Sequence, residues 1–341
     1  MIIDFQSHVF PRRYVEELKR IDGNVVLEPR DPQSGMTYFY DKEIKCRINT
    51  ATFQGQDPDR RIEHMDRLGI DIQVISLPAP GADRFPPEDA IPLARIANDA
   101  VAELCRRHPD RFIGLATLPT SSIKDSLAEL ERAVHELGLR GFGCYTNLNG
   151  KPLDREELFP IYEKLADLKL PVYLHPTAPL ATEAVGLDIM PVLIYGWAFD
   201  STVAMIRLVY GRVLERFPEI DFVVADVGGV VSFFAQRATH IYRGRTEEIR
   251  ERYGLKESPL DSLKRFYVDT ADHPASTLRS VVDFFGPDHL VFATNYPYGP
   301  EEGCLLVKNS LKAIEGLGLS RKESDKILGA NAAKVLGISA Q

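Results

Sequence analysis

Two kinds of segment alternate along the chain, and they differ in the spacing of their apolar residues. Short, almost uninterrupted apolar runs recur, and such runs are typical of strands buried on both faces of a parallel sheet. Each run is followed by a longer stretch whose apolar positions repeat every three or four residues, as on one face of a helix. Strands are expected at residues 2–8, 71–77, 112–118, 141–145, 171–175, 221–226, 266–270 and 289–295.

The intervening stretches carry helix-end signals. One begins at Asp57-Pro58 and stops at Gly69, residue types that favour a helix start and a helix end. Eight strand–helix units predict an α/β protein of the (β/α)8 TIM barrel type. The alternative is an open doubly wound sheet, whose nucleotide-binding form needs a glycine-rich turn that DFQSHVFP lacks. Helices are expected at 57–68, 87–107, 122–137, 154–168, 198–216, 230–247, 274–285, 303–316 and 320–337.

The 341 residues are expected to form a single barrel domain over 1–341, because no linker composition or internal repeat divides them. Residues 9–56 are rich in proline and glycine and poorly periodic. They predict an insertion after the first strand that forms a flap or short hairpin over the barrel mouth. The last amphipathic stretch, 320–337, is expected to be a closing helix.

The composition narrows the functional class. A chain that is 44% hydrophobic and 26% charged is ordinary for a soluble globular protein. The net charge of -8 disfavours nucleic acid and anionic membranes as partners. No apolar stretch is expected to reach the roughly 18 residues that cross a bilayer, and the N-terminus lacks the order of a signal peptide. The four cysteines form no C-x-x-C pair, so free thiols in the cytoplasm are expected.

Polar residues stand where several apolar runs end. His8 closes the first run, His175 the fifth, Asp226 the sixth and Asn295 the last. In a parallel barrel these strand ends meet in one pocket, and histidine can bind a metal or exchange protons near neutral pH. Structural alternatives are a helix N-cap for Asp226 and a turn residue for Asn295. Two histidines at the same rim favour a functional site.

Motifs over nearly the whole chain carry a family resemblance. They are IDFQSHVFP, RRIEHMDRLGIDIQVISLP, RFIGLATLP, LGLRGFGCYTN, ELFPIYEKLADLKLPVYLHP, GRVLERFPEIDFVVADVGG, FYVDTA, FGPDHLVFATNYPYG and ILGANAAKVLG. In their order and spacing they resemble the amidohydrolase-2 family of the amidohydrolase superfamily, and its decarboxylases in particular. The resemblance implies a TIM barrel, a non-oxidative decarboxylase of a small aromatic or muconate-like carboxylic acid, and a homodimer.

The family pattern can be carried over residue by residue. In the family, an H-x-H pair on the first strand, a histidine on the fifth and an aspartate on the eighth bind a divalent metal. A histidine after the sixth strand acts as acid and base. His8 matches the second histidine of the pair, and His175 matches the fifth-strand ligand. Gln6, Asp226 and Asn295 stand where the first histidine, the acid/base histidine and the ligand aspartate would be.

These departures leave two interpretations open. Gln6 and Asn295 offer neutral amide oxygens, which are weak ligands for zinc. A divalent metal, zinc or manganese, would then be held by His8, His175 and Asp226. Without a metal, Asp226, His175 and His8 would act as acid/base groups, with Asp226 holding an imidazolium, while Gln6 and Asn295 bind an oxyanion or hydroxyl of the substrate.

Further residues are candidates for binding the substrate. Arg47 lies in the insertion, where the resemblance loosely implies a carboxylate-binding arginine, and Arg237 matches an arginine that the family uses in the neighbouring subunit's site. Each could instead form a surface ion pair. Trp197 could stack on an aromatic substrate or pack in the core. His64, His108 and His135 fall in expected helices and are expected at the surface.

Two classes of function follow. The first is an enzyme, most simply a carboxy-lyase, with hydrolysis or hydration of a similar cyclic or phenolic compound as the alternative reaction. The second is a non-catalytic descendant that kept the barrel after losing the family's ligands. The replacements Gln6, Asp226 and Asn295 are all polar and able to form hydrogen bonds, which favours the enzyme.

Overall fold

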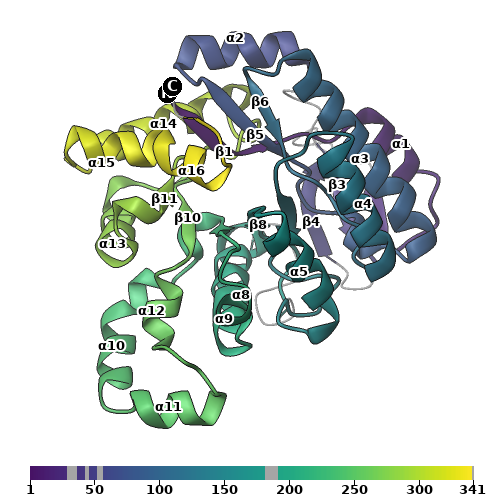
Figure 1. Ribbon diagram of the computed structural model, residues 1–341. Coiled ribbons are helices and arrows are strands. Elements are labelled where there is room, and N and C mark those ends of the chain that lie inside the picture. Colours follow the sequence, from purple (N-terminus) through teal and green to yellow (C-terminus); the bar gives the residue numbers. More distant parts are fainter. Residues whose placement is uncertain (29–36, 43–45, 52–56, 181–190, 340–341) are drawn as a thin grey trace.

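The computed structural model describes residues 1–28, 37–42, 46–51, 57–180 and 191–339. Eight parallel strands form a closed ring (Figure 1). Hydrogen bonding joins β1, β5 and β6 in one sheet and β7 to β11 in order in a second sheet. Parallel bridges at Ala116–Phe142 and Ser7–Tyr296 connect the two sheets. The strands are β1 Ile3–His8, β5 Ile72–Ser76, β6 Phe112–Gly114, β7 Phe142–Tyr145, β8 Val172–His175, β9 Phe222–Val224, β10 Tyr267–Asp269 and β11 Leu290–Val291. The predicted (β/α)8 barrel is therefore confirmed.

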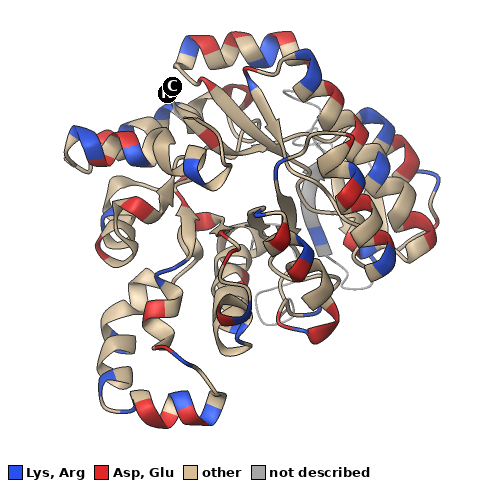
Figure 2. Cartoon of the chain, viewed as in Figure 1, with Lys and Arg blue, Asp and Glu red and all other residues tan. Residues whose placement is uncertain are grey.

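Helices cover the outside of the ring. The first of them, α2, begins where the sequence predicts, because the Asp57 side chain accepts the backbone N–H of Asp59, and it ends at Gly69 with φ 72°. The outer helices are α2 Pro58–Leu68, α3 Pro87–Arg107, α4 Ile123–His135, α5 Phe159–Asp167, α8 Trp197–Tyr210, α9 Val213–Arg216, α10 Ala235–Arg243, α11 Thr246–Tyr253, α12 Pro259–Leu263, α13 Ala275–Phe285 and α14 Cys304–Glu315. Both signs of charge are interspersed over them (Figure 2).

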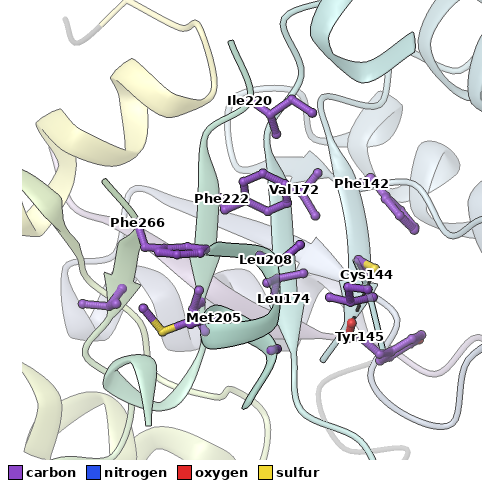
Figure 3. Close-up of a cluster of buried hydrophobic side chains, with 14 of the residues drawn as sticks. Phe142, Cys144, Tyr145, Val172, Leu174, Met205, Leu208, Ile220, Phe222 and Phe266 are labelled. Atoms are coloured by element: carbon purple, nitrogen blue, oxygen red, sulfur yellow. Dashed lines mark hydrogen bonds between the residues drawn. The ribbon is translucent and has the colours of Figure 1, made fainter. Parts of the chain in front are cut away.

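Two apolar layers hold the barrel together. Phe5, Tyr173 and Val223 belong to a cluster within the ring. A larger layer lies between strands and helices, where Phe222 of β9 and Leu208 of α8 belong to one cluster (Figure 3). Residues on both faces of each strand are thus buried, which explains why the strands read as continuous apolar runs.

The insertion after β1 has structure of its own. It contains α1 Arg12–Leu18 and an antiparallel sheet of β2 Val25–Glu28, β3 Thr37–Asp41 and β4 Cys46–Ala51. Phe10, Tyr14 and Phe39 form a separate apolar cluster with residues of α3. This part of residues 9–56 is therefore anchored on the barrel by a core of its own.

The C-terminal segment packs beneath the strands. α15 Arg321–Asp325, a π-helical turn and α16 Asn331–Val335 follow one another, starting from a capping box between Ser320 and Glu323. Ala332 and Val335 join the cluster within the ring. A Cβ at Gly329 would lie 2.3 Å from the Met1 carbonyl oxygen, so only glycine permits this approach to the first strand.

One helical segment corrects an expectation from the sequence. Val192–Tyr210, which consists of a π-helical stretch and α8, is long and apolar enough to cross a bilayer, with a mean hydropathy of 1.4. Core helices of soluble proteins meet the same criterion, and Leu208 and Met205 of this helix pack against the barrel. Its outward apolar residues are Ile194, Tyr195, Phe199, Val203 and Ile206.

Candidate active site

Two histidines face each other at the C-terminal ends of their strands. His8 ends β1 and His175 ends β8, and their ring centroids lie 4.7 Å apart with the planes at 89°. Both side chains are buried. A bulge between Asp4 and Ser7 shifts the register of β1 just before His8, and bulges beside active sites commonly redirect a side chain. The structure thus brings together two residues that are far apart in sequence.

Hydrogen bonds and burial fix the protonation of both rings. Nδ1 of His175 donates to the Pro176 carbonyl at 2.7 Å, which leaves Nε2 as an acceptor. Nδ1 of His8 lies 3.2 Å from Ser76 Oγ, and its Nε2 is buried without a hydrogen-bond partner. Burial lowers the pKa of His175 to about 4, and burial together with His175 and Arg61 lowers the pKa of His8 well below its usual value. Both imidazoles are therefore neutral near pH 7, and neither is held as an imidazolium.

Amides and a buried arginine surround His8. Gln6 is buried on β1, and its Oε1 has no hydrogen-bond partner. The Asn295 side chain approaches His8 and partly offsets the lowering of the His8 pKa. Arg61 of α2 donates to the His8 carbonyl at 2.7 Å and lies over the Tyr296 ring, 4.8 Å from its centroid. Arg61 was not predicted, because a charged residue on an amphipathic helix normally faces water.

Aromatic rings form the walls around the two histidines. Trp197 lies 5.9 Å from His175 between ring centroids, Tyr145 lies 6.5 Å from His175, and Tyr298 lies 5.8 Å from His8. The sequence singled out Trp197 alone. Its Nε1 is buried without a hydrogen-bond partner, as are Gln6 Oε1 and His8 Nε2. Such buried, unsatisfied atoms between aromatic faces are what a planar polar ligand would satisfy.

Asp226 lies at the same rim but among other carboxyls. It follows β9, the strand that pairs with β8, and its φ is 54°. Burial and the neighbouring Asp272 raise the pKa of Asp226 to about 7. Its other acidic neighbour is Asp269, at the end of β10. The helical turn Ser232–Phe234 that follows has no side-chain cap, so the N-cap alternative is not supported.

The two predicted substrate arginines lie on elements outside the barrel strands, and their role stays a prediction. Arg47 of β4 pairs with Glu28 through Nε and Oε2 at 2.5 Å, and its guanidinium lies over Tyr38. This is the ion-pair alternative, formed within the insertion sheet. Arg237 is exposed on α10, which projects from the barrel together with α11 and α12 (Figure 1). His64, expected at the surface, is instead buried with Nδ1 2.9 Å from the Tyr296 hydroxyl.

The side chains at the rim do not fit a divalent metal. Among the residues with described positions, no group of three or more His, Cys, Asp or Glu side chains converges closely enough to hold an ion. The nearest donors are two neutral imidazoles and the amides of Gln6 and Asn295, which carry no negative charge to balance a dication. Asp226, the carboxyl candidate at this rim, does not form such a converging group with His8 and His175 in the described part of the chain.

Comparison with known proteins agrees with the fold. The family model described as Amidohydrolase matches residues 3–338, so the chain belongs to this amidohydrolase family. It is 32% identical to 2-amino-3-carboxymuconate-6-semialdehyde decarboxylase of Dictyostelium discoideum, over 98% of this chain and 91% of that protein. It is 31% identical to gamma-resorcylate decarboxylase of Rhizobium radiobacter, over 70% of this chain and 76% of that protein. The resemblance stated from the motifs is confirmed.

Solved structures give the same architecture. The apo form of Metarhizium anisopliae IDCase superposes with a TM-score of 0.84 at 25% identity, covering 99% of this chain and 97% of that one. A dihydroxybenzoic acid decarboxylase from Polaromonas, with a TM-score of 0.74 at 22% identity, covers 98% of this chain and 96% of that one. That enzyme was crystallised with manganese and the inhibitor 2-nitroresorcinol. The manganese belongs to that enzyme. At 22% identity, its similarity to this chain establishes a shared fold and does not establish a shared metal site.

Proposed function

We propose that the protein is a carboxy-lyase that removes carbon dioxide, without oxidation, from a small carboxylated aromatic or muconate-like acid. The observation that carries the proposal is the pair of facing neutral imidazoles, His8 and His175, beside unsatisfied buried polar atoms and aromatic walls. The decarboxylases among the relatives, at about one third identity, support the same class of reaction.

The reaction exchanges a carboxylate for a proton on one carbon. The bond from that carbon to the carboxyl carbon breaks, carbon dioxide leaves, and the carbon must receive a proton. His8 and His175 are neutral and suited to accept hydrogen bonds from substrate hydroxyls. Among the carboxyl groups at this rim, Asp226 has its pKa raised to about 7, which suits proton exchange near neutral pH, so we assign it the proton transfer.

We further propose that the pocket works without a bound divalent metal, because its donor set does not match one. The side-chain amides of Gln6 and Asn295, beside His8, then form hydrogen bonds with the substrate. Elemental analysis of the protein purified without added metal tests this directly. Stoichiometric zinc or manganese in the purified protein would contradict it.

We also propose a homodimer in which Arg237 reaches the partner's pocket, since Arg237 is exposed on a projecting helix. The exposed apolar residues of Val192–Tyr210 and of Phe233 and Phe234 supply a surface of the kind that subunits cover. Light scattering gives the mass in solution. Mixing Arg237→Ala with His175→Ala protein should restore activity through hybrid dimers, and no recovery would reject the role of Arg237 across subunits. The predicted cytoplasmic location stays a prediction.

The activity itself is tested with a panel of hydroxybenzoates and muconate-type semialdehydes. Carbon dioxide release and the loss of substrate absorbance distinguish decarboxylation from hydrolysis or hydration. A protein that binds members of the panel and turns over none of them would be the non-catalytic descendant.

A further inference from the structure

The turn that presents Asp226 is held in an unusual backbone conformation. Asp226, Val227, Gly228 and Gly229 have φ values of 54°, 55°, 70° and 66°. Glycine tolerates this left-handed region, but a β-branched valine strongly disfavours it. Four such residues in succession persist only when their surroundings hold them, and strain of this kind clusters at functional sites.

The surroundings act on the turn from two sides. On the side of α8, a Cβ at Gly229 would lie 2.2 Å from the Ala198 carbonyl oxygen, and Thr202 Oγ1 accepts the N–H of Val230 at 2.9 Å. The other side is Asp269 of β10, whose carboxyl group interacts with the backbone N–H of Val227, an interaction that lowers the pKa of Asp269. Asp269 is thus bonded to the residue next to Asp226.

Asp269 is itself fixed from a third strand. Its Oδ1 accepts the N–H of Ala271 at 3.3 Å, and its Oδ2 accepts the hydroxyl of Tyr173 at 3.3 Å. Tyr173 belongs to β8 and its ring lies 6.3 Å from that of His175. One carboxyl group therefore links the Asp226 turn to the strand that carries His175.

The position of Asp269 disfavours a charged carboxyl group, because it is buried in the barrel. It is fully buried, and burial and Asp226 raise the pKa of Asp269 well above its usual value. The groups that favour its charged form are hydrogen-bond donors, and none of them is a lysine or arginine within the described part of the chain. An apolar residue would fill a barrel interior at lower cost, so a carboxyl group at this position calls for a role.

We propose that Asp269 is a positioning residue that holds the Val227 backbone, and through it aims Asp226 for proton transfer, while Tyr173 holds the second oxygen of Asp269. The inference rests on the proposed function, because it assumes that Asp226 moves the proton. It assigns no direct contact between Asp269 and the substrate.

Asp269→Asn is the first test, because it keeps the shape and removes one acceptor oxygen. We expect kcat to fall about 10- to 100-fold with KM changed less than about threefold, as for loss of an interaction made in the transition state. Asp221→Asn is the matched control, since Asp221 directly precedes β9 at the opposite end of the strand. Circular dichroism and thermal melting check that both variants fold.

The decisive measurement is made in an Asp226→Asn background. If Asp269 acts through Asp226, adding Asp269→Asn leaves the residual activity of Asp226→Asn unchanged, because the two effects are not additive. A further fall in the double variant, or wild-type kcat in Asp269→Asn alone, overturns the inference. Wild-type activity in Asp226→Asn alone overturns instead the proposed role of Asp226.

Tyr173→Phe carries the same test if Asp269→Asn does not fold. It removes only the hydroxyl group that holds Asp269 Oδ2. We expect a loss in kcat of about 3- to 10-fold that disappears in the Asp226→Asn background. A loss that persists in that background would show a general structural role and contradict the inference.

Discussion

Two sectors of the same barrel rim differ in what burial does to them. The imidazole sector consists of His8, His175 and Asn295, and the carboxyl sector consists of Asp226 and Asp269. Burial lowers the pKa of the histidines and raises the pKa of the aspartates, because in each case it disfavours the charged form. Both sectors are therefore close to neutral at pH 7, but the first offers acceptors and the second holds protons.

The two sectors therefore differ in function although neither places opposite charges in contact: the histidines accept hydrogen bonds and the aspartates supply protons. An imidazolium held by a carboxylate, as the sequence suggested, would have required the two groups to touch. The structure instead gives both histidines lowered pKa values, and Asp226 is not among the groups that shift them. Substrate between the sectors would meet acceptors on one side and a proton donor on the other.

The largest expected effect comes from removing one member of each sector. His175→Ala and Asp226→Ala should each lower turnover about 100-fold or more, which is the usual contribution of a group in acid/base catalysis. The rates are measured by carbon dioxide release under saturating substrate. Near-full activity in both variants would show that the pocket has been placed wrongly.

A second experiment tests whether the rim fails to bind a metal because Gln6, Asp226 and Asn295 replace the residues that the family uses. Gln6→His, Asn295→Asp and Asp226→His together would supply the charged and imidazole donors, and we expect bound manganese to rise to about one ion per chain. Inductively coupled plasma mass spectrometry gives the metal content. Treating the unaltered protein with a chelator should leave its activity unchanged, and a loss restored by manganese would refute metal-independent chemistry.

A buried acid outside both sectors tests the effect of burial on stability. Burial raises the pKa of Asp83 to about 6, and its Oδ1 has no hydrogen-bond partner. Because the folded form binds the proton more tightly than the unfolded form, the stabilisation from protonation is complete below about pH 4 and is lost as pH rises through 6. Asp83→Asn should therefore raise the free energy of unfolding by about 2–3 kcal/mol at pH 8 and by little at pH 4.

Urea denaturation at the two pH values measures this difference. Asp22→Asn, at a fully exposed position, serves as the control and should change neither value. A gain at pH 8 that is equally large at pH 4 would mean that ionisation of Asp83 is not the cause.

The smallest expected effect concerns the aromatic wall. Trp197→Phe keeps a ring beside His175 and removes the buried Nε1–H. We expect KM to rise about three- to tenfold with kcat nearly unchanged, as for an interaction made equally in the ground and transition states. A fall in kcat at constant KM would instead place Trp197 in the chemical step.

Local sequence patterns were enough to predict the fold and part of the candidate site. Strand ends at His8 and His175 could be placed because apolar runs and helix caps are local signals, and barrel topology then brings strand ends together. The same logic correctly places Asp57 and Gly69 at the ends of α2. It does less well at 230–247, where Gly244 separates α10 from α11.

The remaining features depend on tertiary contacts. Arg61 and His64 look like surface residues of an amphipathic helix, and only the packing of α2 against the Tyr296 loop buries them. Tyr145 and Tyr298 enter the site through ring contacts that carry no local pattern. Likewise, the pairing of Arg47 with Glu28 depends on the register of the insertion sheet.

The way the ring closes has a consequence for the order of folding. β1 bonds to the segment around β11, with Phe5 N–H donating to the Phe292 carbonyl at 2.8 Å, and Gly329 seats the last helices on Met1. The first strand of the barrel therefore has its outer edge covered only when the segment around β11 and the last helices are in place. A partly folded form that lacks the C-terminal segment would expose this edge, and an unpaired strand edge can pair with another chain.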